Sequence, residues 1–431
     1  MNYLLKILYN LLLLPLASFR LIYKSYYDKS YLKYVKERYG FCNTKDISKY
    51  IHNTDILIHV VSLGEFIASE KLICSLLSKY PKYNIVVTCT TPTARAKIDS
   101  KFNYNQVFCC YLPYDNYYII NKFIKKLSPK ITIFVEKEIW PNLYSALKKV
   151  NSKIIIINAT LNIKSFNNYN KIHKLIAKSI NQVDYICAQS SDDLNNFVKL
   201  GYDKDNIAVY GNIKYDLDYP TDLDYESNIY KKKLALDDRL VIIAASTHAD
   251  EEDIILKTFI KLKQKNNNLL LILVPRHPHR FDEIYELSKK YNLHTGRYSK
   301  LQGATETLDV FLLDTIGKLL YFYNLSDIAF VGGSLVPNIG CHNILEPAMF
   351  KLPIVIGNNY FNYKDIITRF NNNFGINIAE NNIDLNNIFL KLLNNKELRL
   401  QQGNTAFNEF KKGQGALDKT LKKLEFLLKT T

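Results

Sequence analysis

The sequence predicts an α/β protein built from two Rossmann-like domains, and three observations lead to this prediction. First, 431 residues are enough for two domains of ordinary size. Second, short β-rich runs alternate with longer amphipathic stretches, a pattern typical of right-handed βαβ units and parallel sheets. Third, the apolar alternation weakens around residues 215–228, where Pro220 and several aspartates make the chain polar. We therefore place the domain linker there.

Candidate strands occur in both halves of the chain. In the first half they are Ile56–Val61, Ile85–Thr90, Val107–Tyr111, Ile131–Val135, Ile154–Asn158 and Tyr185–Ala188. In the second half they are Leu240–Ala245, Leu269–Val274, Val310–Leu313, Ile328–Val331, Ile354–Ile356 and Gly375–Ile378. The expected boundaries are 1–24 for a hydrophobic segment, 25–215 for the first domain and 216–431 for the second. Two such domains facing each other would leave a central cleft lined by the carboxyl ends of the strands, where ligands bind in these folds.

Composition and charge narrow the class of protein. Hydrophobic residues make up 47% and charged residues 23%, which indicates a globular chain. The seven cysteines form no CxxC pair and the eight histidines no HExxH motif, so we expect reduced thiols and no metal site. The net charge of +16 favours anionic partners, namely nucleic acid, lipid headgroups or phosphorylated substrates. No nucleic-acid-binding signature accompanies the scattered lysines, so nucleic acid is not expected.

The N-terminus predicts an association with membranes. The segment from Tyr3 to Ile22 is apolar for most of its length but contains Lys6, Asn10, Pro15 and Arg20. A spanning helix needs about 20 predominantly apolar residues, so this segment is marginal as a span. The basic, tyrosine-rich residues that follow it favour an interfacial anchor held at anionic headgroups, with the positive flank on the cytoplasmic side. The alternative is an N-terminal helix buried against the domain.

Chemistry is expected where the strands end. The first strand runs into Ser62-Leu63-Gly64-Glu65, just before a helix expected over Phe66–Tyr80. The dipole of that helix would favour the carboxylate of Glu65 and lower its pKa, and the side chain could act as a general base. Gly64 favours the close approach of a ligand. Helix stabilisation by an acidic residue in the first turn is the alternative interpretation.

The fourth strand and the linker carry further charged residues. The strand ends in Glu136-Lys137-Glu138, followed closely by the only tryptophan, Trp140. One carboxylate could lie near a developing oxocarbenium ion. The alternative is a solvated Glu–Lys pair and a core tryptophan, and we accept it for Lys137 and Glu138. Lys214, at the linker, could neutralise a phosphate or carboxylate during bond cleavage.

In the second half, the most informative segment runs from Phe330 to Phe350. A strand leads into a double glycine, which would let the backbone approach a ligand closely, and then into a turn before a helix, whose first N–H groups would favour phosphate. Glu346 could accept hydrogen bonds from ribose hydroxyls. The local alternative is a capping box formed by Asn343 and Glu346.

At two neighbouring strand ends, Ser246-Thr247 and Arg276 are further candidate phosphate ligands.

These residues resemble a known family. The chain is similar to the Kdo transferases of lipopolysaccharide synthesis, which move 3-deoxy-D-manno-octulosonic acid (Kdo) from CMP-Kdo onto a lipid A precursor. The segments that carry the resemblance occur in the family's order along nearly the whole chain. They are HVVSLGE, YLPYD, EKEIWPNL, GNIKYD, STHADEE, LVPRHPHRF, DTIGKL and FVGGSLVPNIGCHNILEPA.

The resemblance implies a GT-B fold and an inverting transfer that needs neither a metal nor a cofactor. It implies that Glu65 is the general base and that Glu136 and Lys214 stabilise the transition state. The implied partners are CMP-Kdo, the precursor lipid IVA and the lipids of the inner membrane, with the catalytic domains on its cytoplasmic face. The implied CMP-Kdo contacts are Pro275, Arg276, Ile316, Gly317, Lys318, Asn343, Ile344, Leu345 and Glu346.

Four positions depart from the family's usual pattern. Lys137 stands where threonine is usual, Thr160 where arginine is usual, Lys318 where glutamate is frequent and Cys341 where a second glycine is usual. Because Glu65, Lys214, Arg276 and Glu346 are retained, we expect an active enzyme. The alternatives are another membrane-associated GT-B enzyme, such as a nucleotide-sugar transferase or epimerase, and a catalytically silent lipid-binding scaffold.

Overall fold

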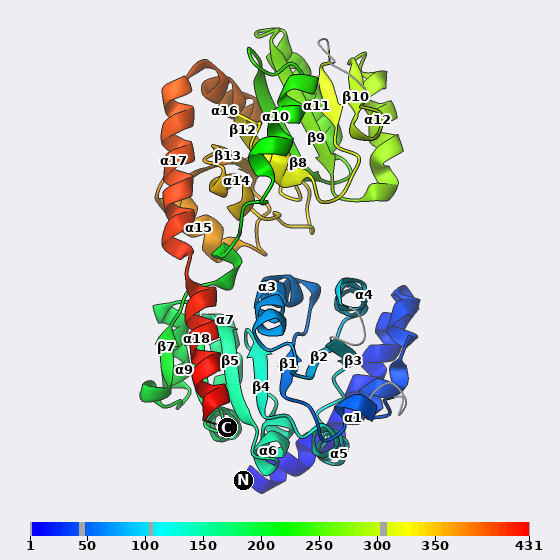
Figure 1. Cartoon of the computed structure of the whole chain (residues 1–431), viewed down its shortest axis with the longest axis vertical. Helices are drawn as coiled ribbons and strands as arrows, with labels where there is room; N and C mark the ends of the chain where they lie inside the picture. Colours follow the sequence, from blue (N-terminus) through cyan, green and yellow to red (C-terminus); the bar gives the residue numbers. More distant parts are fainter. Residues whose placement is uncertain (1, 43–47, 103–106, 302–307, 431) are drawn as a thin grey trace. The chain divides into compact units, whose positions relative to one another are not determined.

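The computed structural model describes residues 2–42, 48–102, 107–301 and 308–430. The chain divides into two compact units, one made of residues 1–216 with 414–431 and the other of residues 217–413. Within the described residues, each unit contains a seven-stranded parallel sheet with helices packed on it, as Figure 1 shows. The predicted α/β class with two Rossmann-like domains is confirmed.

The first sheet reverses its strand order at its centre. Its strands follow the order β3-β2-β1-β4-β5-β6-β7 and are all parallel. They are β1 (Ile56–His59), β2 (Ile85–Cys89), β3 (Val107–Tyr111), β4 (Ile131–Val135), β5 (Lys153–Ala159), β6 (Tyr185–Ala188) and β7 (Ile207–Val209). The chain moves outward in one direction from β1 and in the other from β4. In open α/β sheets, ligands bind at the carboxyl ends of such a pair.

The second sheet has the same kind of switch point, between β8 and β12. Its order is β10-β11-β9-β8-β12-β13-β14. The strands are β8 (Leu240–Thr247), β9 (Leu269–Pro275), β10 (Thr295–Arg297), β11 (Val310–Leu312), β12 (Ile328–Val331), β13 (Ile354–Gly357) and β14 (Ile376–Ala379).

Helices follow most of the strands. In the first unit they are α1 (Asn2–Tyr27), α3 (Leu63–Lys79), α4 (Pro92–Lys101), α5 (Tyr117–Leu127), α6 (Pro141–Lys149), α7 (Ile163–Asn170), α8 (His173–Ile180), α9 (Ser191–Lys199) and α18 (Ala416–Lys429). In the second they are α10 (Leu223–Lys233), α11 (Glu251–Lys263), α12 (Phe281–Lys290), α13 (Leu319–Tyr323), α14 (Leu345–Met349), α15 (Lys364–Asn372), α16 (Asn382–Asn394) and α17 (Lys396–Gly413). Because helices cover both faces, the central strands are buried on both and read as nearly continuous apolar runs.

All twelve strands predicted from the sequence are present, with ends that differ by no more than two residues. Two strands were missed, β7 and β10. Each has only three residues and lies at an edge of its sheet, so neither carries a long apolar run. Short edge strands of this kind give little sequence signal.

The C-terminal segment corrects the predicted domain boundary. We assigned residues 216–431 to the second domain, but residues 414–431 belong to the first unit. Leu417, Leu424 and Leu427 of α18 are buried in the core of the first unit. The carboxylate of Asp216 accepts hydrogen bonds from the backbone N–H groups of Gly415 (2.6 Å) and Leu417 (2.7 Å), which fixes the start of α18.

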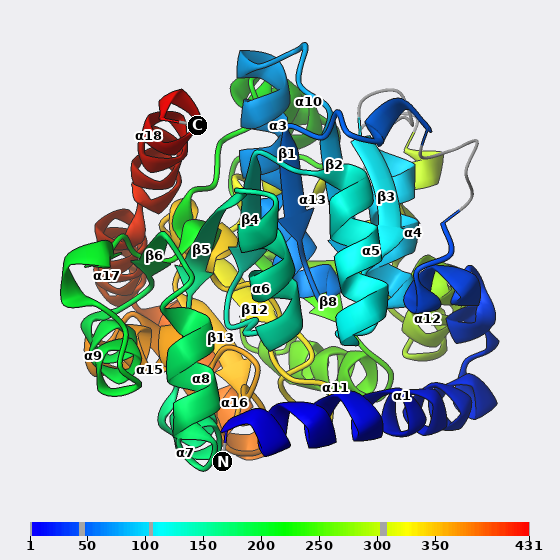
Figure 2. The same cartoon turned by 90° about the horizontal axis from the view of Figure 1, so that it is seen from below.

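Helix α1 contacts the first unit through polar side chains and leaves most of its apolar side chains exposed. Tyr9 donates a hydrogen bond to Asp115 (2.9 Å), and the Asn10 side-chain oxygen accepts from the backbone N–H of Tyr117 (2.8 Å). Figure 2 shows α1 as one long helix whose first turns lie near α8. Residues 7–27 are long and apolar enough to cross a membrane, and 6% of that stretch is buried. The alternative of a buried N-terminal helix is therefore wrong.

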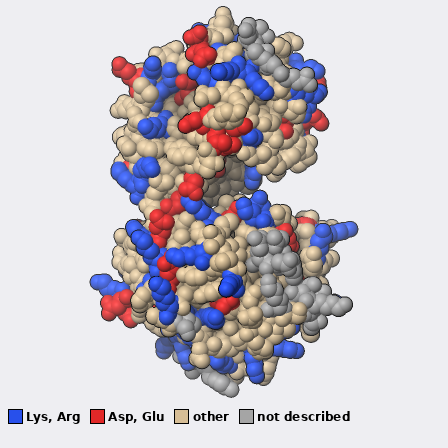
Figure 3. All heavy atoms as spheres, in the orientation of Figure 1, with Lys and Arg blue, Asp and Glu red and all other residues tan. Residues whose placement is uncertain are grey.

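Charged side chains are mixed on the surface. Figure 3 shows Lys and Arg interspersed with Asp, Glu and uncharged residues on both units, on the face drawn there. The lysines and arginines seen on this face are scattered, in agreement with their distribution along the sequence.

Candidate active site

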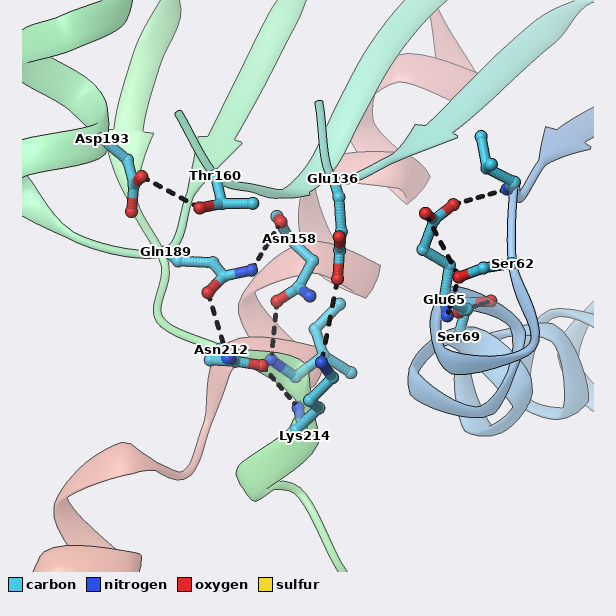
Figure 4. Close-up of polar contacts among 12 residues, drawn as sticks. Ser62, Glu65, Ser69, Glu136, Asn158, Thr160, Gln189, Asp193, Asn212 and Lys214 are labelled. Atoms are coloured by element: carbon cyan, nitrogen blue, oxygen red, sulfur yellow. Dashed lines mark hydrogen bonds and ion pairs between the residues drawn. The ribbon is translucent and has the colours of Figure 1, made fainter. Parts of the chain in front are cut away.

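Glu65 lies at the switch point of the first sheet, in the first turn of α3. The helix begins at Leu63, three residues earlier than predicted, with Ser62 as its N-cap. The Ser62 hydroxyl accepts from the N–H of Glu65 (3.4 Å), and the Glu65 carboxylate accepts from the N–H of Val61 (2.5 Å), as Figure 4 shows. This arrangement resembles a capping box. It holds a carboxylate that is only 8% exposed.

The predicted direction of the Glu65 pKa shift is wrong. Burial raises the pKa of Glu65 to about 8, and the nearby carboxylates of Glu136 and Glu138 also raise it. The hydrogen bond from Val61 acts in the opposite direction but is the weaker effect. The helix dipole was the basis of our prediction, yet its contribution is small beside the cost of removing a carboxylate from water. A carboxyl group with a pKa near neutrality suits proton transfer better than one with an ordinary pKa.

Glu136 and Lys214 form an ion pair in the same unit. Glu136 directly follows β4, the neighbour of β1, and has a left-handed backbone conformation with φ of 67°. Its N–H donates to the carbonyl oxygen of Ile157 (3.0 Å). The Nζ atom of Lys214 lies 3.8 Å from Oε1 of Glu136. Strands β1 and β4 therefore bring two predicted site residues to one edge of the sheet, and the turn that carries Lys214 adds the third.

A chain of side-chain amides holds the turn that carries Lys214. Asn158 accepts from the N–H of Ile213 (3.0 Å), and Gln189 donates to the carbonyl oxygen of Asn158 (2.9 Å). Asn212 in turn donates to Gln189 (3.0 Å) and accepts from the N–H of Lys214 (3.0 Å). Figure 4 shows this network. Our reading of the sequence missed Asn158 and Gln189; the available signal was a side-chain amide at the end of each of two neighbouring strands.

Glu138 differs from its predicted role. We interpreted Glu138 as solvated, but it is half-buried and the Trp140 indole N–H donates to its carboxylate (2.9 Å). Burial raises the pKa of Glu138 to about 7. Trp140 itself is only partly buried, at the border of the core. Glu138 is therefore part of the electrostatic surroundings of Glu65, a role that sequence reasoning missed.

Thr160 directly follows β5, the neighbour of β4, and contacts Asp193 of α9. Thr160, one of the departures from the family pattern, donates a hydrogen bond to the carboxylate of Asp193 (3.2 Å). The same carboxylate oxygen accepts from the N–H of Leu161 (2.6 Å). Asp193 lies in the first turn of α9, so this contact connects the end of β5 to the start of that helix.

The double glycine of the second unit has a packing role that we did not predict. The N–H of Gly332 donates to Ala245 (2.8 Å), and the N–H of Gly333 donates to the buried carboxylate of Glu251 (2.7 Å). A Cβ atom at Gly333 would lie 2.3 Å from the carbonyl oxygen of Gly340. Both of these N–H groups are therefore satisfied within the protein.

Asn343 and Glu346 are in contact, but not as the capping box that we gave as the alternative, because the N-cap of α14 is Ile344. The side-chain oxygen of Asn343 accepts from the N–H of Leu345 (3.1 Å), and its amide donates to the carboxylate of Glu346 (3.1 Å). Burial raises the pKa of Glu346, while Asn343 and the cation of Arg276 oppose that shift. Ile344 and Leu345 are buried beneath the turn.

Arg276 and the turn at 316–318 are the remaining residues that we predicted to contact CMP-Kdo. Arg276 follows β9 directly, is exposed, and donates its backbone N–H to Thr247 (2.9 Å), while Pro275 is the last residue of β9. Ile316 is 80% exposed, and Gly317 has a left-handed φ of 87° with no atom near a substituent Cβ position. Lys318 donates to Glu226 (3.0 Å). Among the described residues, no group of His, Cys, Asp and Glu could hold a metal ion.

Comparisons with known proteins identify the family and the fold separately. A family model for 3-deoxy-D-manno-octulosonic-acid transferase matches residues 33–217. The chain is 37% identical to the 3-deoxy-D-manno-octulosonic acid transferase of Haemophilus influenzae over 396 residues, which is 91% of this chain and 90% of that protein. A glycosyltransferase structure from Rickettsia africae, 16% identical, has a TM-score of 0.52 over 88% of this chain and all of that one. The UDP-GlcNAc 2-epimerase of Neisseria meningitidis, 13% identical, has a TM-score of 0.56 over 87% of this chain and all of that one. These two structures share the fold.

Proposed function

This chain belongs to the 3-deoxy-D-manno-octulosonic acid (Kdo) transferase family, and on that premise we propose how its residues carry out the transfer. It is a glycosyltransferase that transfers Kdo in lipopolysaccharide biosynthesis. The donor in our proposal is CMP-Kdo, the acceptor is the lipid A precursor lipid IVA, and the anomeric configuration is inverted. The observation that carries this proposal is the buried Glu65, with a pKa near 8, beside the Glu136–Lys214 pair.

In this mechanism Glu65 removes a proton from a sugar hydroxyl of the acceptor. The resulting oxygen attacks the anomeric carbon of Kdo while the bond to the phosphate of CMP breaks. A single displacement inverts the anomeric carbon, and no covalent intermediate with the enzyme forms. Burial supports this role, because it gives Glu65 a proton affinity far above that of an exposed carboxylate.

Glu136 and Lys214 stabilise the charges that develop during bond cleavage. The anomeric carbon gains positive character, which a carboxylate beside it stabilises, and the Kdo carboxylate or the leaving phosphate is neutralised by an ammonium group. The contact of 3.8 Å between Lys214 Nζ and Glu136 Oε1 supports a shared function. The amide network through Asn158 and Asn212 supports it too, because it limits the movement of the Lys214 turn before substrate arrives.

The second unit binds the nucleotide part of the donor in this proposal. Arg276 lies directly after β9 and is exposed. Its positively charged side chain is therefore accessible to a phosphate or a carboxylate of the donor. Glu346, held by Asn343, accepts hydrogen bonds from ribose hydroxyls. The turn at Gly317 contacts the donor through its backbone, because the side chain of Lys318 donates its hydrogen bond to Glu226. The other predicted contacts, Pro275, Ile316, Ile344 and Leu345, shape the same site.

We also place α1 in the membrane interface, lying along the bilayer. Its apolar side chains, such as Leu16 (65% exposed) and Phe19 (72% exposed), have little protein to cover them. Tyr9 and Asn10 bond to Asp115 and Tyr117 of the folded unit. A helix that crossed the bilayer would have to break these bonds or draw polar protein into lipid, which is costly. An in-plane anchor keeps them and brings the unit to the surface that holds the lipid acceptor.

The proposal is tested by a transfer reaction with the purified full-length protein in detergent. CMP-Kdo is generated in situ, lipid IVA is the acceptor, and mass spectrometry measures the lipid product. A product heavier by one or more Kdo residues supports the proposal and counts the additions. A matched reaction with UDP-GlcNAc separates it from the nucleotide-sugar enzymes that share the fold. Turnover of UDP-GlcNAc without any transfer of Kdo would reject the proposal.

A further inference from the structure

Two histidines meet at the switch point of the second sheet. His248 directly follows β8, and His342 lies in the loop that follows β12, the strand beside β8. Their imidazole rings are parallel, with centroids 5.0 Å apart and an interplanar angle of 0°. The two Nε2 atoms are 2.7 Å apart. With these distances the rings lie edge to edge, and each Nε2 points at the other.

This geometry requires one proton between the two rings. Two facing N–H groups would repel at 2.7 Å, and two facing lone pairs would repel as well. With one proton shared between the Nε2 atoms, the pair is neutral when it holds one more proton on its two Nδ1 atoms. It carries a charge of +1 when it holds two more. The pair can therefore gain one proton without breaking the bond between the rings, and it then presents two outward N–H donors.

The groups around the pair determine which of these states is present. His277 and Arg276 follow β9, Arg280 lies just after them, and the Glu251 carboxylate at the start of α11 accepts from the backbone N–H of His248 (3.0 Å). Burial, and to a smaller extent the neighbouring cationic and imidazole groups, lower the pKa values of His248 and His342 to about 4. At neutral pH the unliganded pair is neutral. An anion placed beside it would favour the charged state.

We propose that His248 and His342 act together as a proton-coupled phosphate ligand, which gains one proton when the donor binds and gives it to the phosphate as the sugar departs. This inference rests on the proposed function, because it takes the donor to be a cytidine monophosphate sugar. His342 directly precedes the predicted nucleotide contact Asn343, and His277 directly follows Arg276. The pair therefore lies among the residues expected to meet the phosphate. A leaving phosphate gains negative charge as its bond to carbon breaks, so a proton donor there lowers the barrier.

The protons and electrons balance over one turnover. The acceptor oxygen forms a bond to the anomeric carbon, and the bond from that carbon to the phosphate oxygen breaks with its electron pair going to the phosphate. Glu65 takes the acceptor's proton, and the histidine pair gives a proton to the phosphate. The pair ends neutral and Glu65 ends protonated. The pair took its proton from solvent when the donor bound, and Glu65 returns one proton to solvent, so both groups are back in their starting states.

Calorimetric titration with CMP tests this inference without measuring turnover. The full-length protein is titrated with CMP at mildly alkaline pH, where the nucleotide's own phosphate, with a pKa of about 6, is already a dianion. Buffers with different heats of ionisation report how many protons are taken up on binding. We expect the uptake of about one proton per CMP, and an affinity that falls up to about tenfold for each unit of rising pH.

Variants identify the group that takes up the proton. His248→Gln and His342→Gln each leave a side chain that can form hydrogen bonds but cannot gain a proton in this range, so each should lose the uptake and flatten the pH dependence. His294→Gln, an exposed histidine before β10, is the matched control and should behave as the wild type. Circular dichroism and melting temperature show whether each variant is folded. If one variant does not fold, proton uptake by the other variant and the pH dependence of CMP binding by the wild type test the inference.

The outcomes separate this inference from the proposed function. CMP binding without proton uptake, or uptake that persists in both variants, would overturn the histidine inference and leave the proposed function intact. No CMP binding by the folded wild-type protein would count against the proposed donor itself. Proton uptake that both variants lose, with the control unchanged, is the result that supports the pair.

Discussion

Oε1 of Glu136 lies 3.8 Å from Nζ of Lys214, and these two residues come from parts of the chain nearly eighty positions apart. Glu136 is in place because β4 ends there, and Lys214 because its turn is bonded to Asn158 and, through Asn212, to Gln189. Neither side chain is deeply buried, so the direct attraction between them contributes little to stability. In our proposal the pair instead acts on the charges that develop beside it during the transfer.

The first prediction concerns the proposed base. Glu65→Gln keeps the size of the side chain and its capping position but removes the ability to accept a proton at neutral pH. Turnover should fall by about 10²- to 10⁴-fold, because general base catalysis contributes about that much. Steady-state kinetics measure the loss, and CMP binding serves as the control because it should not change. Transfer at the wild-type rate would remove Glu65 from the mechanism.

The second prediction is a pH dependence with two parts. Activity should rise with pH as Glu65 loses its proton near its pKa of about 8. Stability should move the other way. Between the ordinary carboxyl pKa of 4.5 and about 8, the unfolded chain has released the proton that the folded protein still holds, so the free energy of unfolding falls as pH rises.

Glu65→Gln tests the stability part of this prediction. The amide stays neutral in both states, so the variant should melt at a higher temperature than the wild type in mildly alkaline buffer and at nearly the same temperature near pH 4. The slope of the wild-type contribution is at most about 1.4 kcal/mol per pH unit. Melting curves measured across this range that show no divergence would contradict the raised pKa.

The third prediction concerns the ammonium group. Lys214→Ala should lower kcat by about 10²- to 10³-fold, the usual cost of removing one group that stabilises a developing charge. Lys199→Ala, at an exposed lysine in the last turn of α9, removes the same charge elsewhere in the unit and is the control. If both variants lost activity equally, the effect would belong to net charge and not to the Glu136–Lys214 pair.

The fourth prediction concerns donor binding. Arg276→Ala should weaken CMP binding about 10- to 100-fold, because hydrogen bonds between charged groups are worth about 1.5–3 kcal/mol. Lys265→Ala, an exposed cation after α11 in the same unit, should bind CMP as the wild type does. Calorimetry of the two variants side by side provides the comparison. Unchanged affinity in Arg276→Ala would contradict its placement at the phosphate.

The fifth prediction concerns α1. Phe19→Glu places a charge in the exposed apolar side of the helix and should reduce binding to anionic phospholipid vesicles about 10- to 100-fold, as the loss of one buried aromatic side chain implies. Phe426→Glu, on α18, is the matched control and should leave vesicle binding unchanged. Co-sedimentation measures both. If the wild-type protein resisted extraction at alkaline pH, α1 would be a spanning helix and not an in-plane anchor.

Several features of the candidate site could be predicted from the sequence because they depend on neighbouring residues. Glu65, Glu136 and Arg276 each follow a strand that an apolar run marks. Their place at the carboxyl ends of the strands could therefore be predicted. The direction of the Glu65 pKa shift was not. The helix dipole is a local effect that can be read from the sequence, whereas desolvation depends on what covers the side chain.

The histidine pair and the end of the chain show the same limit. His248 and His342 are nearly one hundred positions apart, and only the pairing of β8 with β12 brings their Nε2 atoms to 2.7 Å from each other. Residues 414–431 follow the last helices of the second unit in sequence, which is why we assigned them to it. Their leucines instead pack in the core of the first unit.

The sequence by itself determined the elements and the family of this protein. Apolar runs of strand length, helical periodicity and eight motif segments depend on residues close together in the chain, and they established the α/β class and the Kdo transferase resemblance. Only the tertiary structure decided which strand ends are neighbours, which carboxylates are removed from water and where the last helix packs. The physical reason is that strand order, burial and electrostatic environment arise from contacts between distant segments, and these exist only in the folded chain.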